Sequence, residues 1–426
     1  MNWIDRDAAV VWHGFTQMSC YADNEPLIVE RGDGHYLFDT AGNKYLDAIS
    51  SLWVTTLGHH VPELDQAIRD QLDRVAHTTM LGNGNRIVIE FAEALARVVP
   101  VDQPHFVFAS DGAAAVEQAL KIAFQFWTNS GVQGRTKYLA FGGAYHGDSV
   151  GSLSLGDGGF GTDIFDPLRF SVIRAPGFND PDCMTVAAAL IAEHRDALAA
   201  VVVEPLVQGA AGVLSAPAKS FAAIQKACSD NGVLLICDEV ATGFGRTGTL
   251  FASEQCGLTP DIMCLGKGIT GGYLPMSATA VSQRVYDAFL GPDLSEKTFY
   301  HGHSYSGNAL AAAVALRHLE LFKEWHVLDN VTVRSTQLGQ RMTADITPLP
   351  QVREMRLIGL MCAVEIDAPE SDPLWARRTA AAMTRRGVLA RSLGDNIILV
   401  PHLTSTADEI DLITDTLVSA INEACQ

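Results

Sequence analysis

The sequence predicts an α/β protein with a large domain built on a mostly parallel sheet and a smaller α+β domain. Three observations support this class: a series of short apolar runs, a helical pattern between two of them, and a change of pattern near the C-terminus. The runs have the length and the near-continuous apolar character of strands buried on both faces of a parallel sheet. They span residues 105–110, 137–141, 198–203, 233–237 and 262–265.

A helical pattern follows the first run and connects it to the second. Its apolar residues recur at spacings of three and four, so one face of the helix is apolar and is expected to pack on the sheet. These residues are Val116, Ala119, Leu120, Ala123, Phe124 and Trp127. A strand, a helix and a further strand make a βαβ unit, which gives parallel pairing.

The pattern changes after about residue 316. A long helical segment is followed by short apolar runs at 359–366 and 397–400 and by a final helical pattern over 407–424. This change predicts a second, smaller domain. The expected boundaries are 1–55 for an N-terminal segment that belongs to the small domain, 56–315 for the large domain, and 316–426 for the C-terminal small domain.

The composition is that of a globular protein with a large core, since 48% of the 426 residues are hydrophobic and 19% are charged. The formal net charge of -19 disfavours binding to nucleic acid or to a membrane surface, because both require clustered Lys and Arg. No run approaches the roughly 20 apolar residues of a membrane helix. The N-terminus also lacks the apolar region of a signal peptide, so we expect a cytoplasmic protein that acts on small molecules.

Two strand ends carry the residues that are most informative about chemistry. The run 233–237 delivers Asp238 at its C-terminal end, and the run 262–265 is followed by Gly266 and Lys267. Ligands of open α/β sheets bind at this edge. We therefore expect a carboxylate and an amine to face a common ligand.

Other motifs fit this region less well. A phosphate-binding P-loop would need glycine at Asp261 and serine or threonine at Gly268. The stretch 243–248 matches Gly-x-Gly-x-x-Gly, but no long helix and acidic strand end follow it, as dinucleotide binding requires. A lysine after a strand is also commonly a solvated loop residue.

No metal site is predicted. His301 and His303 stand two positions apart, and His59 and His60 are adjacent. Neither pair has a third and a fourth ligand at a spacing typical of zinc sites.

The stretch 238–248, Asp-Glu-Val-Ala-Thr-Gly-Phe-Gly-Arg-Thr-Gly, with Pro-Asp-Ile at 260–262 and Gly-Lys-Gly at 266–268, resembles the signature of class III aminotransferases. These are fold type I enzymes that use pyridoxal 5′-phosphate (PLP). The resemblance runs from Trp12 to the C-terminus, and within the class it is greatest to the 7,8-diaminopelargonate synthases of biotin biosynthesis. The supporting segments are Ser-Ser-Leu-Trp at 50–53, Tyr-His-Gly-Asp at 145–148, Glu-Pro-Leu-Val-Gln-Gly at 204–209 and His-Gly-His-Ser-Tyr-Ser-Gly-Asn at 301–308.

The resemblance implies catalytic roles that the chemistry of the residues fits. Lys267 would carry PLP covalently and then move a proton between the substrate carbon and the cofactor carbon. Asp238 would keep the pyridine nitrogen protonated, because a nearby opposite charge stabilises the charged form. Tyr145 matches the residue whose ring stacks on the cofactor, while a core tyrosine fits the sequence equally well.

The cofactor phosphate needs hydrogen-bond donors. Gly112 and Ala113, at the start of the predicted helix, would offer backbone N–H groups and the positive end of the helix dipole. Asp111 is interpreted as the helix N-cap, turned away from the phosphate. By resemblance, His303 and Ser304 add a contact from a partner subunit, which implies a homodimer with shared active sites.

The resemblance further implies conversion of 8-amino-7-oxononanoate to 7,8-diaminononanoate by ping-pong transamination. Arg391 matches the arginine that binds the substrate carboxylate, a task that suits a planar guanidinium. The resemblance assigns Phe15, Leu52, Trp53 and Gly302 to the substrate site. Two alternatives stay open: a broader ω-amino-acid or diamine aminotransferase of class III, and a noncatalytic relative that acts as a binding protein.

The amino donor is the least determined feature. Relatives that use S-adenosylmethionine typically have Tyr, Trp and Tyr at the positions of Phe15, Leu52 and Ile398. A sulfonium compound with an adenine group would gain from cation–π and stacking contacts that the residues present here do not provide. This difference indicates another donor. The segments 57–59, 297–303 and 393–395 resemble the members that use lysine more closely, so the resemblance slightly favours lysine over S-adenosylmethionine.

Overall fold

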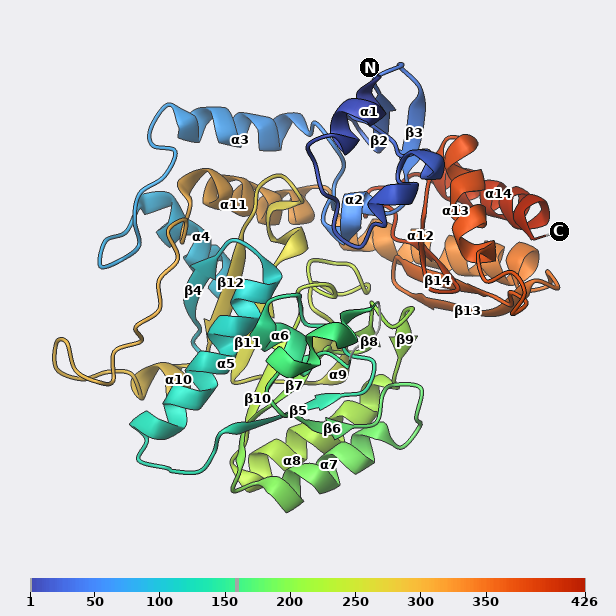
Figure 1. The fold of residues 1–426 in the computed structure, drawn as a ribbon. Helices are drawn as coiled ribbons and strands as arrows, with labels where there is room; N and C mark the ends of the chain where they lie inside the picture. Colours follow the sequence, from blue (N-terminus) through green and yellow to red (C-terminus); the bar gives the residue numbers. More distant parts are fainter. Residues whose placement is uncertain (1, 158–160, 426) are drawn as a thin grey trace. The chain divides into compact units, whose positions relative to one another are not determined.

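The computed structural model describes residues 2–157 and 161–425, which form two compact units (Figure 1). The small unit comprises Met1–Leu52, Leu57–Val61 and Val333–Gln426, and the large unit comprises Trp53–Thr56 and Pro62–Thr332. The N-terminal and C-terminal parts of the chain thus meet in one unit, because strands from both share a sheet.

A seven-stranded sheet in the order β4-β12-β11-β10-β7-β5-β6 forms the centre of the large unit. Its strands are β4 (His105–Ala109), β5 (Lys137–Phe141), β6 (Ile173–Ala175), β7 (Leu198–Val203), β10 (Leu234–Asp238), β11 (Ile262–Leu265) and β12 (Ser277–Val281). β10 pairs in parallel with β7 and β11, and β5 pairs in parallel with β6 and β7. β12 alone is antiparallel to its neighbours β4 and β11. All five predicted runs form strands of this sheet, so the predicted fold class is confirmed.

Helix α5 (Gly112–Asn129) covers one face of this sheet. Its apolar side is buried in one cluster with alternate residues of the strands, among them Val202 of β7 and Ile236 of β10. Leu235 and Cys237, which point to the other face, are at most 1% exposed, so both faces are covered. The predicted apolar face is correct except at Phe124, which is 47% exposed. Phe124 lies about 80° around the helix from Val116 and so falls at the edge of the buried face.

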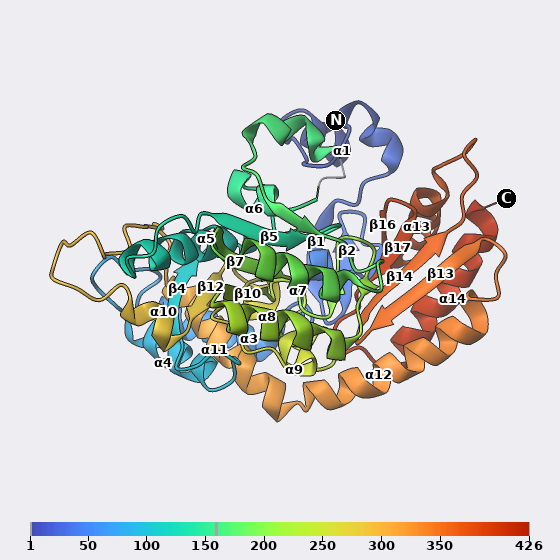
Figure 2. The ribbon, with the colours of Figure 1, turned by 90° about the horizontal axis from the view of Figure 1, so that it is seen from below.

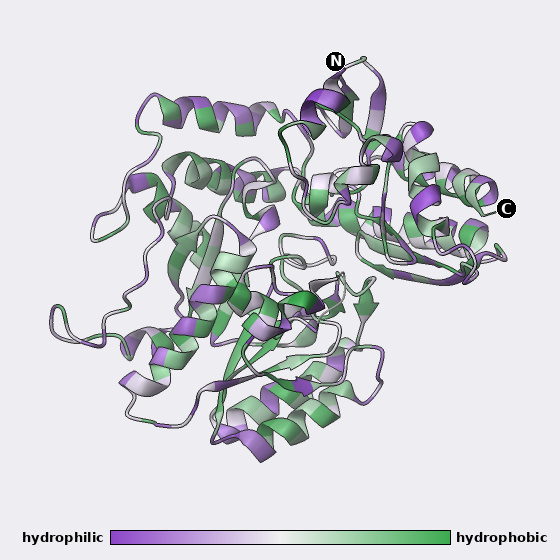
Figure 3. Ribbon diagram, in the orientation of Figure 1, coloured by the Kyte–Doolittle hydropathy of each residue, from purple (hydrophilic) through white to green (hydrophobic). Residues whose placement is uncertain are grey.

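The other helices of the large unit pack against the sheet or against one another. α7 (Cys183–His194) and α8 (Ala222–Asn231) lie side by side next to β7 and β10 (Figure 2), and α11 (Ala309–Glu324) packs on α3 (Pro62–Leu72) and α4 (Arg86–Ala96). The strands of the sheet are coloured mostly as hydrophobic in Figure 3. The shorter elements are α6 (Val150–Leu155), α9 (Ala252–Cys256), α10 (Gln283–Asp287) and the strand pair β8 (Val207–Gln208) and β9 (Leu214–Ser215).

Two four-stranded sheets form the small unit, in the orders β1-β2-β3-β15 and β13-β14-β17-β16. β15 pairs in parallel with β3, which joins the C-terminal part to the N-terminal segment. The strands are β1 (Val29–Asp33), β2 (Tyr36–Asp39), β3 (Lys44–Asp47), β13 (Val352–Ile358), β14 (Met361–Ile366), β15 (Val388–Leu389), β16 (Arg391–Leu393) and β17 (Asn396–Leu399). The helices are α1 (Trp3–Ala8), α2 (Ser50–Trp53), α13 (Trp375–Arg385) and α14 (Ala407–Ala424).

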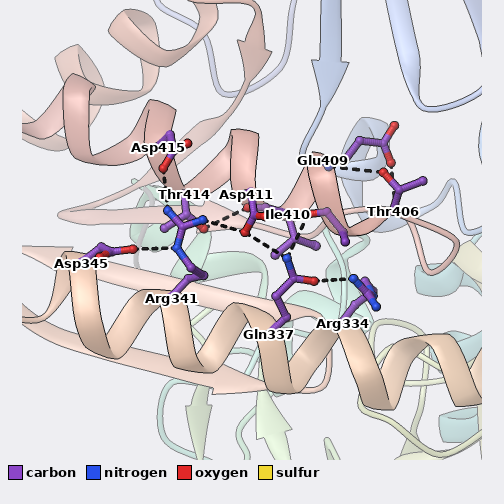
Figure 4. A network of polar contacts seen from close by, with 11 residues as sticks. Arg334, Gln337, Arg341, Asp345, Thr406, Glu409, Ile410, Asp411, Thr414 and Asp415 are labelled. Atoms are coloured by element: carbon purple, nitrogen blue, oxygen red, sulfur yellow. Dashed lines mark hydrogen bonds and ion pairs between the residues drawn. The ribbon is translucent and has the colours of Figure 1, made fainter.

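Helix α12 (Val327–Arg341), from Val333 onward, is joined to α14 by polar contacts (Figure 4). Arg341 donates to Asp411 Oδ1 at 2.6 Å and to Asp415 Oδ1 at 2.5 Å, and Gln337 donates to Asp411 Oδ1 at 2.9 Å. Partly exposed ion pairs of this kind contribute about 1 kcal/mol or less each. The network therefore orients the two helices more than it stabilises the unit.

Across the part of the chain that the structure describes, no helix combines the length and the apolar character required to cross a membrane.

Candidate active site

Asp238 and Lys267 lie at the ends of two adjacent parallel strands. Asp238 is the last residue of β10 and stands opposite Cys264 of β11, while Lys267 opens the 3-10 turn Lys267–Thr270 just after β11. Both residues line one cavity of about 660 Å³. The structure therefore brings the predicted carboxylate and amine together at the strand ends, where open α/β sheets bind ligands.

The Lys267 amine is held in a buried and strained setting. The backbone φ of 43° is a left-handed conformation, which costs a non-glycine residue about 1 kcal/mol or more. The Nζ atom lies 4.8 Å from the centre of the Trp53 ring. Burial lowers the pKa of Lys267, and the carboxylates of Asp238 and Glu204 partly oppose this effect. A lysine with a lowered pKa has more of its unprotonated, nucleophilic form at neutral pH.

Asp238 is fixed by two hydrogen bonds. His146 Nδ1 lies 2.7 Å from Asp238 Oδ2, with the two side chains 0% and 5% exposed, and the Val240 backbone N–H donates to Oδ1 at 3.0 Å. The buried Nε2 atom of His146 has no hydrogen-bond partner among the described residues. Asp238 also lines the cavity, so its carboxylate is oriented and still available to a ligand.

Glu204 adds a second buried carboxyl group to this site. Burial raises the pKa of Glu204 to about 7, the nearby His146 lowers it, and the Asp238 carboxylate raises it. Its oxygens accept the backbone N–H groups of Tyr145 at 3.2 Å and Gly209 at 3.4 Å. The sequence reasoning assigned no role to His146 and Glu204, although both stand in segments that carried the resemblance. His146 follows the predicted cofactor residue Tyr145 directly in the sequence, which was its only signal, and Glu204 had no signal beyond its place in a segment of the resemblance.

The start of α5 also lines the cavity. Ser110, Asp111, Gly112 and Ala113 line it, and Asp111 caps the helix as predicted, because its Oδ1 accepts the Ala114 N–H at 2.8 Å. A Cβ atom on Gly112 would stand 2.5 Å from Val240 Cγ1, so the tight approach of helix and strand requires glycine. Free backbone N–H groups at a helix start suit a phosphate. With an amine and an acid at the other end, these residues fit PLP.

Tyr145, His303 and Ser304 were also predicted to contact the cofactor. Tyr145 lines the cavity and donates its hydroxyl to Asp148 Oδ2 at 2.9 Å. Burial, followed by the charge of Asp148, raises the pKa of Tyr145. His303 Nε2 lies 3.0 Å from Ser110 Oγ of the same chain. The backbone oxygen of Ser304 lies 2.8 Å from the Nε2 atom of His77. Within one chain, the segment 303–304 is thus connected to the strand end that precedes α5.

The predicted substrate residues are divided between the two units. Trp53, which lines the cavity, and Gly302 belong to the large unit, whereas Phe15, Leu52 and Arg391 belong to the small unit. Phe15 is 63% and Leu52 48% exposed. Arg391 lines a second cavity, of about 970 Å³, together with residues of the segment 23–28 and of α13. Ile398, which entered the donor argument, is buried in β17 opposite Arg391.

One group of side chains in the small unit has the composition of a metal site. The ligand atoms of Asp47, His59 and His402 lie within 4.8 Å of one another. The sequence reasoning had considered only neighbouring histidines, and these ligands are far apart along the chain. His301 and His303, which the sequence analysis considered as metal ligands, have polar partners instead. His301 Nδ1 lies 3.0 Å from Lys121 Nζ, and His303 forms a hydrogen bond with Ser110.

Comparisons with known proteins agree with this geometry. Residues 18–421 match the family model described as aminotransferase class-III. The chain is 43% identical, over 97% of its length and 80% of the relative, to the adenosylmethionine-8-amino-7-oxononanoate aminotransferase of Nitratidesulfovibrio vulgaris. It is 40% identical, over 98% of its length and 96% of the relative, to the protein of the same name from Aquifex aeolicus.

Solved structures extend this agreement to the fold. The crystal structure of adenosylmethionine-8-amino-7-oxononanoate aminotransferase from Methanocaldococcus jannaschii matches with a TM-score of 0.95 at 37% identity, covering 99% of both chains. An amine transaminase from an uncultivated Pseudomonas species, solved in its PLP-bound form, matches with a TM-score of 0.91 at 33% identity, covering 97% of this chain and 99% of that one. The chain therefore belongs to the class III aminotransferases, which use pyridoxal 5′-phosphate.

Proposed function

We propose that this protein transfers an amino group to 8-amino-7-oxononanoate and so forms 7,8-diaminononanoate, a reaction of biotin synthesis. Two observations together carry the proposal. Asp238 and Lys267 line one cavity, and the relatives named for this activity are similar to nearly the whole length of this chain. A noncatalytic binding protein would have no use for an oriented carboxylate and a buried amine in one cavity.

PLP, when bound, supplies a protonated ring that accepts electron density from the substrate. Lys267 would hold this cofactor, and its free amine would serve as the base that moves a proton from the substrate carbon. Its lowered pKa supports this task, because the amine must be unprotonated when it acts as a base. Asp238 holds the proton on the ring nitrogen, since a fixed carboxylate stabilises the adjacent positive charge.

His146 and Gly112 support the same reaction indirectly. His146 donates a hydrogen bond to Asp238 and so keeps one carboxylate oxygen directed to the cavity. Gly112 and Ala113 bind the phosphate through backbone N–H groups, and Tyr145 covers the ring. We also propose a homodimer in which His303 and Ser304 of one subunit serve the phosphate of the other.

Substrate selection is assigned to Arg391 and to apolar residues. Arg391 is proposed to bind the acceptor carboxylate, because a guanidinium binds a carboxylate through two parallel hydrogen bonds. Phe15, Leu52 and Trp53, with Gly302, are proposed to accommodate its methylene chain. An Arg391→Lys variant should raise the KM for the acceptor, since a lysine cannot form both bonds.

The donor needs a direct measurement. The relatives named above carry adenosylmethionine in their names, which gives no support to the slight preference for lysine that the sequence suggested. Purified holoenzyme mixed with one donor at a time, without acceptor, should lose the absorbance of lysine-bound cofactor with the true donor alone. Loss with lysine and not with S-adenosylmethionine would restore the original preference.

The acceptor is tested by product identification. Holoenzyme, donor and 8-amino-7-oxononanoate should yield 7,8-diaminononanoate, detected by mass spectrometry. Turnover of 4-aminobutyrate or β-alanine with none of 8-amino-7-oxononanoate would contradict the proposal and favour a broader ω-amino-acid aminotransferase.

A further inference from the structure

A strained turn lies directly before Trp53, the residue whose ring stands beside Lys267. Ser50, Ser51 and Trp53 have φ values of 48°, 61° and 63°, and Leu52 between them is extended. Each left-handed conformation costs a non-glycine residue about 1–3 kcal/mol. Several left-handed residues close together are stable only where contacts with the surrounding structure hold the backbone in that conformation. The contacts of this turn therefore show which groups hold it.

Asp47 makes most of these contacts. Its Oδ2 atom accepts the Ser51 backbone N–H at 2.8 Å and the Ser51 hydroxyl at 3.3 Å, and its Oδ1 atom accepts the Ile49 N–H at 3.2 Å. A second contact comes from Val400, the residue after β17, whose carbonyl accepts a hydrogen bond from Ser50 Oγ at 2.6 Å. The Asp47 carboxylate and the Val400 carbonyl, both of the small unit, therefore contribute to holding the turn.

His59 orients the Asp47 carboxylate, and His402 lies near it. Its side chain is 0% exposed, and a buried carboxylate requires compensating donors or positive charge. His59 Nε2 lies 3.0 Å from Oδ2, and the buried His402 Nε2 lies 3.9 Å from the same atom. The His402 ring in turn stacks on His35, with ring centres 4.9 Å apart, and His35 Nδ1 lies 2.7 Å from Glu409.

We propose that Asp47, oriented by His59, is a positioning residue for transamination. It fixes the backbone of residues 50–52 and thereby the direction in which the chain enters Trp53, whose ring lines the Lys267 cavity. Asp47 touches neither substrate nor cofactor in this account and acts through Trp53. The inference rests on the proposed function, because the ring of Trp53 is taken to bound the substrate.

The test is a double-mutant cycle on the holoenzyme, with Asp47→Asn, Trp53→Phe and the combined variant. Asparagine keeps only one of the two acceptor oxygens and cannot accept at both the Ile49 and the Ser51 side of the turn, so Asp47→Asn should raise the KM for the keto acceptor about tenfold, with kcat changed less. In the Trp53→Phe background the same change should raise KM less than about twofold, because residues that act as a unit are non-additive. If the role of Asp47 were purely structural, Asp47→Asn would lower stability. The factor by which it raises KM would then be the same in the wild-type and in the Trp53→Phe background.

Two further variants keep the test decisive. Asp180→Asn is the matched control, because Asp180 Oδ1 also accepts a backbone N–H group of its own turn, from Asp182 at 2.8 Å, and it should leave KM unchanged. If Asp47→Asn yields no folded protein, Ser50→Ala removes the bond to Val400 and should give a smaller rise in KM that also disappears in the Trp53→Phe background. Equal KM ratios in both backgrounds would overturn the inference, as would an unchanged KM. A wild-type enzyme without turnover would instead contradict the proposed function.

Discussion

Asp238 and Asp47 are both buried carboxylates next to histidine, and they differ in which of their acceptor positions remain open to a ligand. Asp238 accepts from His146 and from one backbone N–H group, and its side chain lines the 660 Å³ cavity. Asp47 accepts from His59 and from the Ile49 and Ser51 N–H groups of its own turn. The Asp238 carboxylate therefore faces a cavity that can hold a ligand, whereas the Asp47 carboxylate is occupied by hydrogen bonds from the backbone. A buried acid paired with histidine is therefore informative about catalysis only when its remaining contacts are counted.

The largest expected effect comes from removing the amine that faces Asp238. Lys267→Ala should reduce turnover by about a thousandfold or more, because the residue is both the attachment point and the proton carrier. Product formation at saturating substrates measures this loss. The variant should also release its cofactor on dialysis, while the wild type retains it. Turnover close to that of the wild type would contradict the assignment of Lys267.

Neutralising the carboxylate that lines the cavity should have the next largest effect. Asp238→Asn should lower kcat by about a hundredfold, because an amide cannot hold a proton on the ring nitrogen. Asp261→Asn is the control, since Asp261 accepts the Leu235 N–H on a neighbouring strand and has Arg284 as its ion-pair partner. The control should keep its kcat. Equal losses in both variants would indicate damage to the sheet instead of the site.

Exchanging the histidine of each pair tests the comparison directly. His146→Phe removes the donor to Asp238 and should weaken PLP binding and lower kcat, each by about tenfold. His146→Asn, which keeps a donor, should restore part of both. His59→Asn should leave the dissociation constant for PLP unchanged, because its carboxylate partner binds no ligand. Fluorescence titration of the apoproteins with PLP measures these constants, and similar weakening by both substitutions would remove the distinction between the pairs.

The smallest effect concerns the pH dependence of stability near Asp238. The pKa of Glu204 in the folded state is about 7, raised from 4.5, so the folded protein holds this proton more tightly than the unfolded chain. The resulting stabilisation is fully present below about pH 4.5 and is lost as the pH rises through 7. The free energy of unfolding of the apoprotein should therefore fall more steeply over this range than that of Glu204→Gln. Urea titrations at each pH measure it, and parallel curves would argue against a raised pKa.

The strands that could be predicted from the sequence are those whose residues are almost all apolar. The β7 and β11 runs are continuously apolar, and their predicted bounds match those of the strands. β12 was not predicted, because Ser277 and Thr279 interrupt its apolar residues, and both are buried. Thr279 satisfies its hydroxyl by donating to the Ala115 carbonyl at 2.9 Å, a partner 164 positions away that no local pattern reveals.

The same limit applies to the site. Asp238 and Lys267 could be predicted because each follows a recognisable strand and the resemblance rests on their segments. The contributions of His146, Glu204 and Asp47 depend on neighbours distant in sequence, such as the 92 positions between His146 and Asp238. Single-sequence reasoning identifies the residue types that can titrate, but the burial and pairing that set their roles arise only from the fold.

The close approach of Gly112 to Val240 determines which cofactor lengths the site accepts. Val240 lies against the start of α5, where we propose that the phosphate binds, through its side chain, and it holds Asp238 through its backbone N–H. The same residue therefore sets the span between the group that binds the phosphate and the group that binds the ring nitrogen. An alanine at position 112 would place its Cβ 2.5 Å from Val240 Cγ1, so the Val240 side chain or the start of α5 would have to shift, and the spacing on which a ring and phosphate of fixed size depend would be disturbed with every catalytic side chain intact.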